Sequence, residues 1–191
     1  RGGEGAGLRG EGRGAGLKSS QSKDFAGGRR DDIRALLDRE DMADQEMVDY
    51  LAHTLQEPGG PRPSIETLLH GFVDARAVVH THADAIVSLT NTDRPREILT
   101  GVYGREVIPL AYRRPGFRIS KDVAEVIAAH PEAKALVLER HGTITWGATM
   151  REAYGGTIEL ISRAEAAIAE RRAGRKVFGA PRVPAREPGE R

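Results

Sequence analysis

Apolar positions along the chain recur with two spacings, and the two alternate from about residue 31 onward. Apolar residues three and four positions apart predict helices, and short runs of β-branched and aliphatic residues predict strands. The predicted helices cover 31–37, 43–56, 64–72, 85–91, 95–102, 120–129 and 149–172. The predicted strands cover 77–82, 107–110, 134–139 and 142–146. This alternation predicts one α/β sandwich with helices on both faces of a sheet.

The two ends of the chain differ from this middle part. Residues 1–16 contain eight glycines among arginines and glutamates, and a segment so poor in large apolar side chains is expected to be a flexible tail. The letters of residues 5–10 match a dinucleotide-binding fingerprint, but no predicted strand precedes them and no amphipathic helix follows directly. We therefore expect a flexible or altered segment over 1–30, one domain over 31–172 and a proline-rich linker or tail over 173–191.

Composition narrows the classes of function. The chain has 191 residues, with 29 basic and 28 acidic side chains and a formal net charge of +1. This balance disfavours a partner held by charge alone, so we expect no nucleic acid and no membrane as partner. Neither an apolar run of the roughly 20 residues that span a bilayer nor a leader-like segment is found, and we expect a cytoplasmic protein. Without cysteine, any metal must be held by histidines and carboxylates.

Three histidines at strand ends form the candidate metal site. His80 and His82 are two positions apart on a predicted strand, where alternate side chains share one face about 6.5 to 7 Å apart. His141 ends another apolar strand at a glycine-containing turn, a position where α/β sheets often place functional groups. Three histidines with an open fourth position are the ligand set of a catalytic zinc ion. The alternative is that they are ordinary surface or core residues.

Glu66 and His70 lie four positions apart on a predicted helix, with Ser64 placed to cap its first N–H groups. Near a divalent cation, Glu66 could remove a proton from a carbon next to a polarised carbonyl. His70 could orient a metal ligand from behind. A solvated glutamate and a packed histidine are the plainer interpretations. For His53 and His130 we favour packing or helix-end capping.

Several of these motifs together resemble the class II aldolase/adducin family. The resemblance covers about residues 60–172, and within the family it is greatest to the aldolase portion of bifunctional rhamnulose-1-phosphate aldolase/alcohol dehydrogenase proteins. It rests on Pro63-Ser64-Ile65-Glu66-Thr67 with His70, Val79-His80-Thr81-His82, Arg114-Pro115-Gly116-Phe117, His141-Gly142 and Trp146-Gly147. The fold that it implies is a three-layer α/β/α class II aldolase-like fold with a central mixed or antiparallel sheet.

The resemblance also implies an activity. Zn²⁺ held by His80, His82 and His141 would serve an aldolase of rhamnose catabolism that cleaves a deoxyketose 1-phosphate, similar to rhamnulose 1-phosphate, into dihydroxyacetone phosphate and lactaldehyde. Glu66 corresponds to the acid/base carboxylate of the family, and Ser64 to a residue that holds the substrate phosphate. Tyr112 lies where such enzymes place a tyrosine that protonates the aldehyde oxygen across a subunit interface. Family members are typically homotetramers, which we expect here.

One departure from the family keeps other interpretations open. The usual Gly-Asn-x-Ser segment and Lys-Gly-Ser-Gly-like loop are replaced by a glycine- and arginine-rich stretch, in which Lys18-Ser19-Ser20 resembles a remnant of the loop. We therefore expect an intact zinc site with impaired phosphate binding in a shortened or altered chain. The alternatives are a pentulose-phosphate epimerase or a dehydratase of the same fold, and a non-catalytic module similar to the adducin head.

Overall fold

A four-stranded mixed sheet forms the centre of the computed structural model, which describes residues 7–11, 21 and 24–175. The strands are β3 (Ala77–Thr81), β6 (Gly142–Gly147), β5 (Ala135–Leu138) and β4 (Val107–Leu110), in that spatial order. β6 pairs antiparallel with both β3 and β5, while β4 and β5 are parallel. The four strands predicted from the sequence are thus confirmed. The register between them, which the sequence did not predict, decides which side chains meet.

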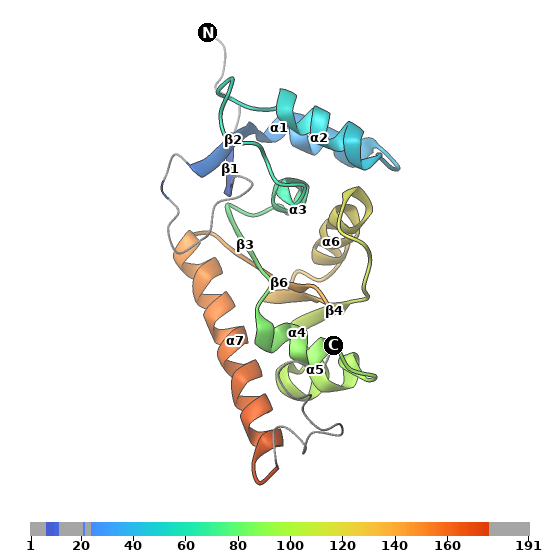
Figure 1. Ribbon diagram of the computed structural model, residues 1–191, viewed down its shortest axis with the longest axis vertical. Helices are drawn as coiled ribbons and strands as arrows, with labels where there is room; N and C mark the ends of the chain where they lie inside the picture. Colours follow the sequence, from blue (N-terminus) through green and yellow to red (C-terminus); the bar gives the residue numbers. More distant parts are fainter. Residues whose placement is uncertain (1–6, 12–20, 22–23, 176–191) are drawn as a thin grey trace, which may run out of the picture.

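Helices cover both faces of this sheet, as Figure 1 shows. Helices α3 (Thr67–Phe72) and α6 (Phe117–Ala129) lie on one face, and α4 (Asp84–Thr90), α5 (Pro95–Tyr103) and α7 (Met150–Arg172) on the other. Helices α1 (Arg30–Ala35) and α2 (Asp44–His53), with a short 3₁₀ turn at Leu36–Asp38 between them, pack outside α3 and α6. Each predicted helix is present, with boundaries shifted by a few residues. The Thr149–Glu152 pair starts α7, because the Glu152 N–H donates to Thr149 Oγ1 at 3.2 Å.

The core is divided by the sheet into two layers. On one face Ala135 and Val137 of β5 pack against buried residues of α4, α5 and α7. On the other face Leu136 and Leu138 pack against α3 and α6. Successive residues of a strand point to opposite faces, so one short apolar strand serves both layers. The three-layer α/β/α architecture with a mixed sheet is confirmed.

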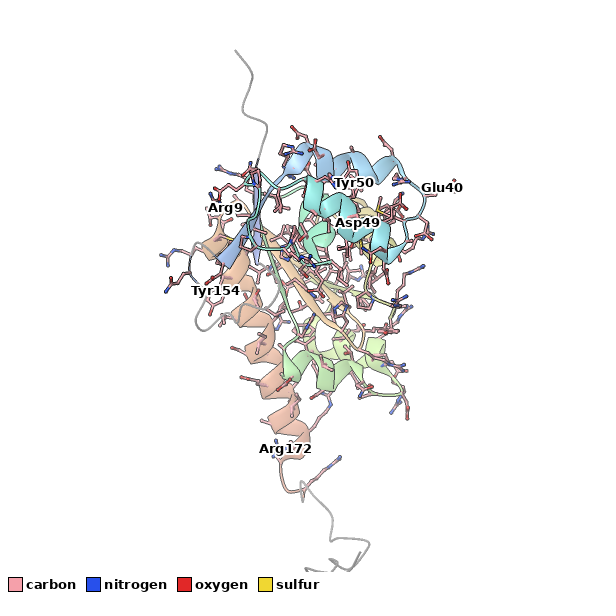
Figure 2. All side chains as sticks on the ribbon, turned by 45° about the horizontal axis from the view of Figure 1, so that its top comes forward. Arg9, Glu40, Asp49, Tyr50, Tyr154 and Arg172 are labelled. Atoms are coloured by element: carbon pink, nitrogen blue, oxygen red, sulfur yellow. The ribbon has the colours of Figure 1, made fainter. Side chains whose placement is uncertain are left out.

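A further apolar cluster joins α1 and α2 to the outer side of α3 and α6. Ile33, Met47, Leu51 and Leu68 are fully buried there, each at most 1% exposed. The hydroxyl of Tyr50, which is labelled in Figure 2, donates a hydrogen bond of 3.0 Å to the Asp32 carbonyl and so ties α2 to α1. The apolar cluster and this hydrogen bond hold α2 and α3, the two helices at the ends of the segment in which Ser64 and Glu66 lie.

The glycine-rich beginning of the chain contains structure that the sequence pattern did not predict. Gly7–Glu11 (β1) pairs antiparallel with Phe25–Arg29 (β2), so the expectation of a flexible tail is wrong for these five residues. A ladder needs backbone N–H and C=O groups rather than large side chains, and Leu8 adds an apolar contact with the cluster around Ile33. Residues 1–6, 12–20, 22–23 and 176–191, and with them Lys18-Ser19-Ser20, lie outside the described residues.

Helix α3 begins at Thr67, three residues later than predicted. Ser64 Oγ accepts a hydrogen bond of 3.2 Å from the Glu66 N–H, and the Thr67 N–H donates to the Ser64 carbonyl at 3.0 Å. Ser64 therefore closes the turn before the helix, and Glu66 lies at the helix boundary. Within the residues that the structure describes, no helix combines the length and the apolar stretch that a membrane crossing requires.

Replacing Tyr103 with phenylalanine tests one polar contact within the core. The Tyr103 hydroxyl is buried and donates to the Leu160 carbonyl at 2.8 Å, so Tyr103→Phe should lower the free energy of unfolding by about 1 kcal/mol at pH 8. Burial also raises the pKa of Tyr103 to about 12. Ionisation therefore favours the unfolded state of the wild-type protein as the pH rises from about 10 to 12.

The difference between wild type and Tyr103→Phe should accordingly narrow above pH 10, because phenylalanine has no proton to lose. Urea unfolding at pH 8 and pH 11 measures it, with Tyr154→Phe as control, since Tyr154 is exposed on α7. Equal stability of wild type and Tyr103→Phe at pH 8 would contradict the hydrogen bond to Leu160. A stability difference between them that stays constant up to pH 11 would contradict the raised pKa of the Tyr103 hydroxyl.

Candidate metal centre

Four potential ligand side chains meet where β3 ends and β6 begins. His80 is on β3, His82 follows it, and His141 directly precedes β6. The antiparallel register pairs His80 with Ile144 and Thr81 with Thr143, so the end of β3 lies beside the start of β6. Glu66 reaches the same place from the boundary of α3. Among the described residues, Glu66, His80, His82 and His141 form a group whose ligand atoms all lie within 4.8 Å of one another.

The distances inside this group match those expected around one small cation. The Nε2 atom of His82 is 3.0 Å from Nε2 of His80 and 3.0 Å from Nε2 of His141. Glu66 Oε1 lies 3.4, 3.3 and 3.2 Å from Nε2 of His80, His82 and His141, respectively. Tetrahedral zinc with ligands at about 2.0 to 2.1 Å has neighbouring ligand atoms about 3.3 to 3.4 Å apart. The group is therefore already close to a coordination shell.

The protonation of His80 follows from its second hydrogen bond. His80 Nδ1 lies 3.0 Å from the Thr143 carbonyl, which can only accept, so Nδ1 carries a hydrogen and Nε2 points into the group. Burial, followed by the charge of His80, lowers the pKa of His82. Hydrogen bonds with His141 and His80 hold the pKa of Glu66 far below its usual range. The group thus presents three imidazole nitrogens and a carboxylate oxygen to one another.

This donor set fits a divalent transition metal. Imidazole nitrogens and a carboxylate oxygen at these separations need a shared proton or a cation between them, and imidazole with carboxylate suits zinc and its neighbours in the series. The His80 and His141 side chains are 3% and 8% exposed, whereas His82 is 55% exposed. A small molecule could therefore approach from the side of His82.

Gly142 allows the two strand ends to come this close. A Cβ atom on Gly142 would lie 2.3 Å from the Thr81 carbonyl oxygen and 3.1 Å from Cδ2 of the His82 ring. A methyl group cannot make the first contact without displacing the backbone of β3, and the second would push the His82 ring aside. The glycine after His141 is therefore required by the approach of β6 to β3.

The other predicted site residues lie outside the ligand group. His70 is nearby, because its N–H donates to the Glu66 carbonyl at 3.3 Å, and burial lowers the pKa of its ring to about 4. Ser64 lines a cavity of about 400 Å³ between α2 and the segment 62–65. Tyr112 follows β4 and is 54% exposed. The structure brings together Glu66 and the three histidines, and neither Ser64 nor Tyr112 contributes a ligand atom.

Two features of the site were not anticipated from the sequence. Glu66 Oε1 lies at the fourth corner of the group, where an open position was expected. The carbonyl that orients His80 belongs to Thr143, a residue without any motif. Contacts of this kind depend on strand register, which the residue pattern of one strand does not contain. His53 and His130 pair instead with the Asp49 carbonyl and Glu132.

The family of the chain follows from comparison with known proteins. Residues 35–168 match the family described as class II aldolase and adducin N-terminal domain, which is more than half of the chain. The chain belongs to this family. The N-terminal class II aldolase domain of a conserved protein from Thermoplasma acidophilum superposes with a TM-score of 0.79 at 40% identity, over 85% of this chain and 75% of that one.

Two curated relatives are much less completely covered. An uncharacterised oxidoreductase of Bacillus subtilis, YuxG, is 43% identical over 90% of this chain and 25% of its own length. The methylthioribulose-1-phosphate dehydratase of Pseudomonas syringae pv. tomato is 32% identical over 58% of this chain and 63% of its own length. The chain thus spans a quarter of one relative and less than two thirds of the other.

The close approach at Gly142 predicts a large effect of a single methyl group. Gly142→Ala should lower the free energy of unfolding by about 1 to 3 kcal/mol, because the added carbon meets backbone atoms of β3. Urea denaturation measures the change. Gly101→Ala in α5 is the matched control, since nothing lies within 4 Å of its added carbon, and should stabilise the protein by about 0.5 to 1 kcal/mol. Equal stabilities of the two variants would contradict the described strand contact.

Proposed function

We propose that this protein is a zinc-dependent lyase that cleaves a deoxyketose 1-phosphate similar to rhamnulose 1-phosphate into dihydroxyacetone phosphate and lactaldehyde. The observation that carries the proposal is the group of three imidazole nitrogens and one carboxylate at the ends of β3 and β6. Membership of the class II aldolase and adducin family supports a metal-dependent reaction. The cleavage type and the sugar rest on the resemblance of the motifs around these residues.

His80, His82 and His141 would hold the zinc ion, and Glu66 Oε1 lies where a fourth ligand belongs. When bound, Zn²⁺ acts as a Lewis acid that stabilises negative charge on the oxygens of a hydroxyketone. A hydroxyketone bound at the same place would take over the position that Glu66 Oε1 holds in the metal-free group. The displaced carboxylate then stays next to the substrate, two residues after Ser64.

Glu66 is the proton carrier in this proposal. In the cleavage the ionised Glu66 takes the proton of the C4 hydroxyl as the C3–C4 bond breaks, so C4 becomes the aldehyde and the electron pair of the bond stays on C3, beside the C2 carbonyl. Glu66 returns a proton to C3, which completes dihydroxyacetone phosphate. In the metal-free group, hydrogen bonds with His141 and His80 hold the pKa of Glu66 far below its usual range, and a bound cation would likewise favour the ionised form, so Glu66 enters the reaction able to take a proton.

A dehydratase is the second candidate. Methylthioribulose-1-phosphate dehydratase is similar to this chain over 129 residues, and that similarity favours it over other reactions of the fold. In a dehydration the same carboxylate would remove the C3 proton and pass it to the C4 hydroxyl, which would leave as water. Both reactions place negative charge on C3 next to a polarised carbonyl, so one site serves either. An epimerase and a non-catalytic module similar to the adducin head are the remaining alternatives.

Product analysis on the purified chain decides between these reactions. With zinc and rhamnulose 1-phosphate, fuculose 1-phosphate or methylthioribulose 1-phosphate, cleavage yields dihydroxyacetone phosphate, which a coupled NADH oxidation detects, whereas dehydration yields a diketone seen by mass spectrometry. Elemental analysis should find about one zinc per chain, as for a site of four ligands. His82→Ala should lose metal and turnover together, and His53→Ala, outside the group, should lose neither.

Glu66→Gln separates the proton carrier from the ligand set. The amide keeps the size of the side chain but cannot carry the proton, so turnover should fall by about 10²-fold or more while the three histidines still bind zinc. Glu57→Gln, at an exposed position, is the control. Cleavage retained in His82→Ala would refute the zinc lyase, and zinc binding without turnover of any ketose phosphate would favour the non-catalytic module.

A homotetramer completes the proposal, with Tyr112 acting on the site of a neighbouring copy. Three exposed apolar side chains support self-association: Met150, Tyr154 and Ile158 recur every four residues on one face of α7, where Figure 2 labels Tyr154. Light scattering of the purified chain should give four times the monomer mass. A monomer would contradict the assembly and the proposed role of Tyr112.

A further inference from the structure

The turn that carries His141 has an unusual backbone. It connects β5 to β6 through residues 139–141, and the His141 N–H donates to the Leu138 carbonyl at 3.1 Å. Arg140, in the middle of the turn, has a φ of 59°, in the left-handed region that favours glycine. A non-glycine residue stays in this region when its surroundings hold it there. The contacts of Arg140 therefore matter for His141.

Thr90 is the residue that holds Arg140. It is the last residue of α4, is fully buried, and its Oγ1 accepts a hydrogen bond of 2.9 Å from the Arg140 N–H. The same hydroxyl donates to the Ile86 carbonyl at 3.2 Å, shared with the Val87 carbonyl at 3.3 Å. Both the donor and the acceptor capacity of this hydroxyl are used, so its direction is fixed by α4.

α4 is itself firmly anchored. Ile86 and Leu89 lie in the apolar cluster that joins α4 to α5, α7 and the sheet. At the base of the turn the Glu139 N–H donates to the Leu110 carbonyl at 2.9 Å, and Leu138 pairs with Gly142 in the ladder. The turn is thus held by the ladder at its base and by Thr90 at its tip.

His141 depends on this backbone more than His80 does. The ring of His80 is oriented by the Thr143 carbonyl through Nδ1. His141 Nδ1 is buried and has no hydrogen-bond partner within the part of the chain that the structure describes. No contact of Nδ1 there sets the direction of the His141 ring, and the position of its Nε2 follows from the turn that carries it.

We propose that Thr90 is a positioning residue for His141: its hydroxyl holds the Arg140 amide, and with it the strained turn, in the shape that brings His141 Nε2 to the ligand group. This inference rests on the proposed metal site and deepens it. Thr90 lies on α4, which carries none of the four side chains of the group, and it acts through the backbone of Arg140. A residue with this function should change the affinity for metal more than the stability of the metal-free fold.

Cobalt binding tests this role, with Co²⁺ as the probe because its absorption bands report both affinity and coordination geometry. Thr90→Val keeps the shape of the side chain and removes the acceptor, so Co²⁺ affinity should fall by about tenfold or more, as for other residues that orient ligands. Thr90→Ser keeps the hydroxyl and should restore the affinity and the spectrum of the wild type. Thr92→Val is the matched control, because its hydroxyl bonds the Leu89 carbonyl at the same helix end without touching the turn.

Two further measurements separate positioning from stability. Amide hydrogen exchange of the full chain should show faster exchange of the Arg140 N–H in Thr90→Val and not in Thr92→Val. Thermal unfolding in chelator gives the stability of the metal-free proteins. If Thr90→Val does not fold, Thr90→Ala, which also lacks the hydroxyl and introduces no new bulk, takes its place.

The outcomes are distinct for the inference and for the proposed function. Equal Co²⁺ affinity and spectra of wild type and Thr90→Val would overturn the positioning role and leave the metal site intact. Weakened binding in Thr90→Ser and Thr92→Val to the same degree as in Thr90→Val would also overturn it, because the loss would then follow from general destabilisation. Wild-type protein that binds neither Co²⁺ nor Zn²⁺ would refute the metal site and this inference together.

Discussion

The antiparallel pairing of β3 with β6 is the interaction on which the site depends. It places the end of one strand, with His80 and His82, beside the start of another, with His141, although they lie far apart in the chain. The pairing can close this far only because Gly142 has no side chain where the Thr81 carbonyl approaches. A shift of the β3 register by one residue would turn His80 to the opposite face of the sheet, away from His141.

The remaining parts of the molecule hold this junction in place. The apolar layers on both faces fix the sheet, and the cluster of α1 and α2 on the outside of α3 fixes the segment that carries Glu66. The site thus combines rigid strand ends with a carboxylate at a helix boundary. Three of the four side chains thus come from strand ends and the fourth from a separate segment, in a group that could hold a metal ion.

Charge explains why these polar groups are tolerated together. His80 and His141 are nearly buried, and three imidazoles and a carboxylate without a cation would face one another at 3.0 to 3.4 Å. The hydrogen bond from His80 Nδ1 to the Thr143 carbonyl turns the Nε2 atom of this ring into the group. Protons shared with Glu66, or a cation in their place, would offset the cost of burying these polar groups together.

The elements of the central domain and the residues of the candidate site could be predicted from local patterns in the sequence. Hydrophobic spacing marked each strand of the main sheet and each helix, because both follow from local periodicity. The His80-Thr81-His82 spacing, His141-Gly142 and Glu66 identified the four side chains of the group. Local patterns failed at Gly7–Glu11 and Phe25–Arg29, whose pairing uses backbone groups that composition does not reveal.

Three contacts of the site could not be predicted from the sequence and were found in the folded chain. Glu66 Oε1 lies close to all three histidines, the Thr143 carbonyl orients His80, and the Thr90 hydroxyl binds the Arg140 N–H in the turn that carries His141. These contacts join residues far apart in sequence, and they are set by strand register and helix packing rather than by any local pattern.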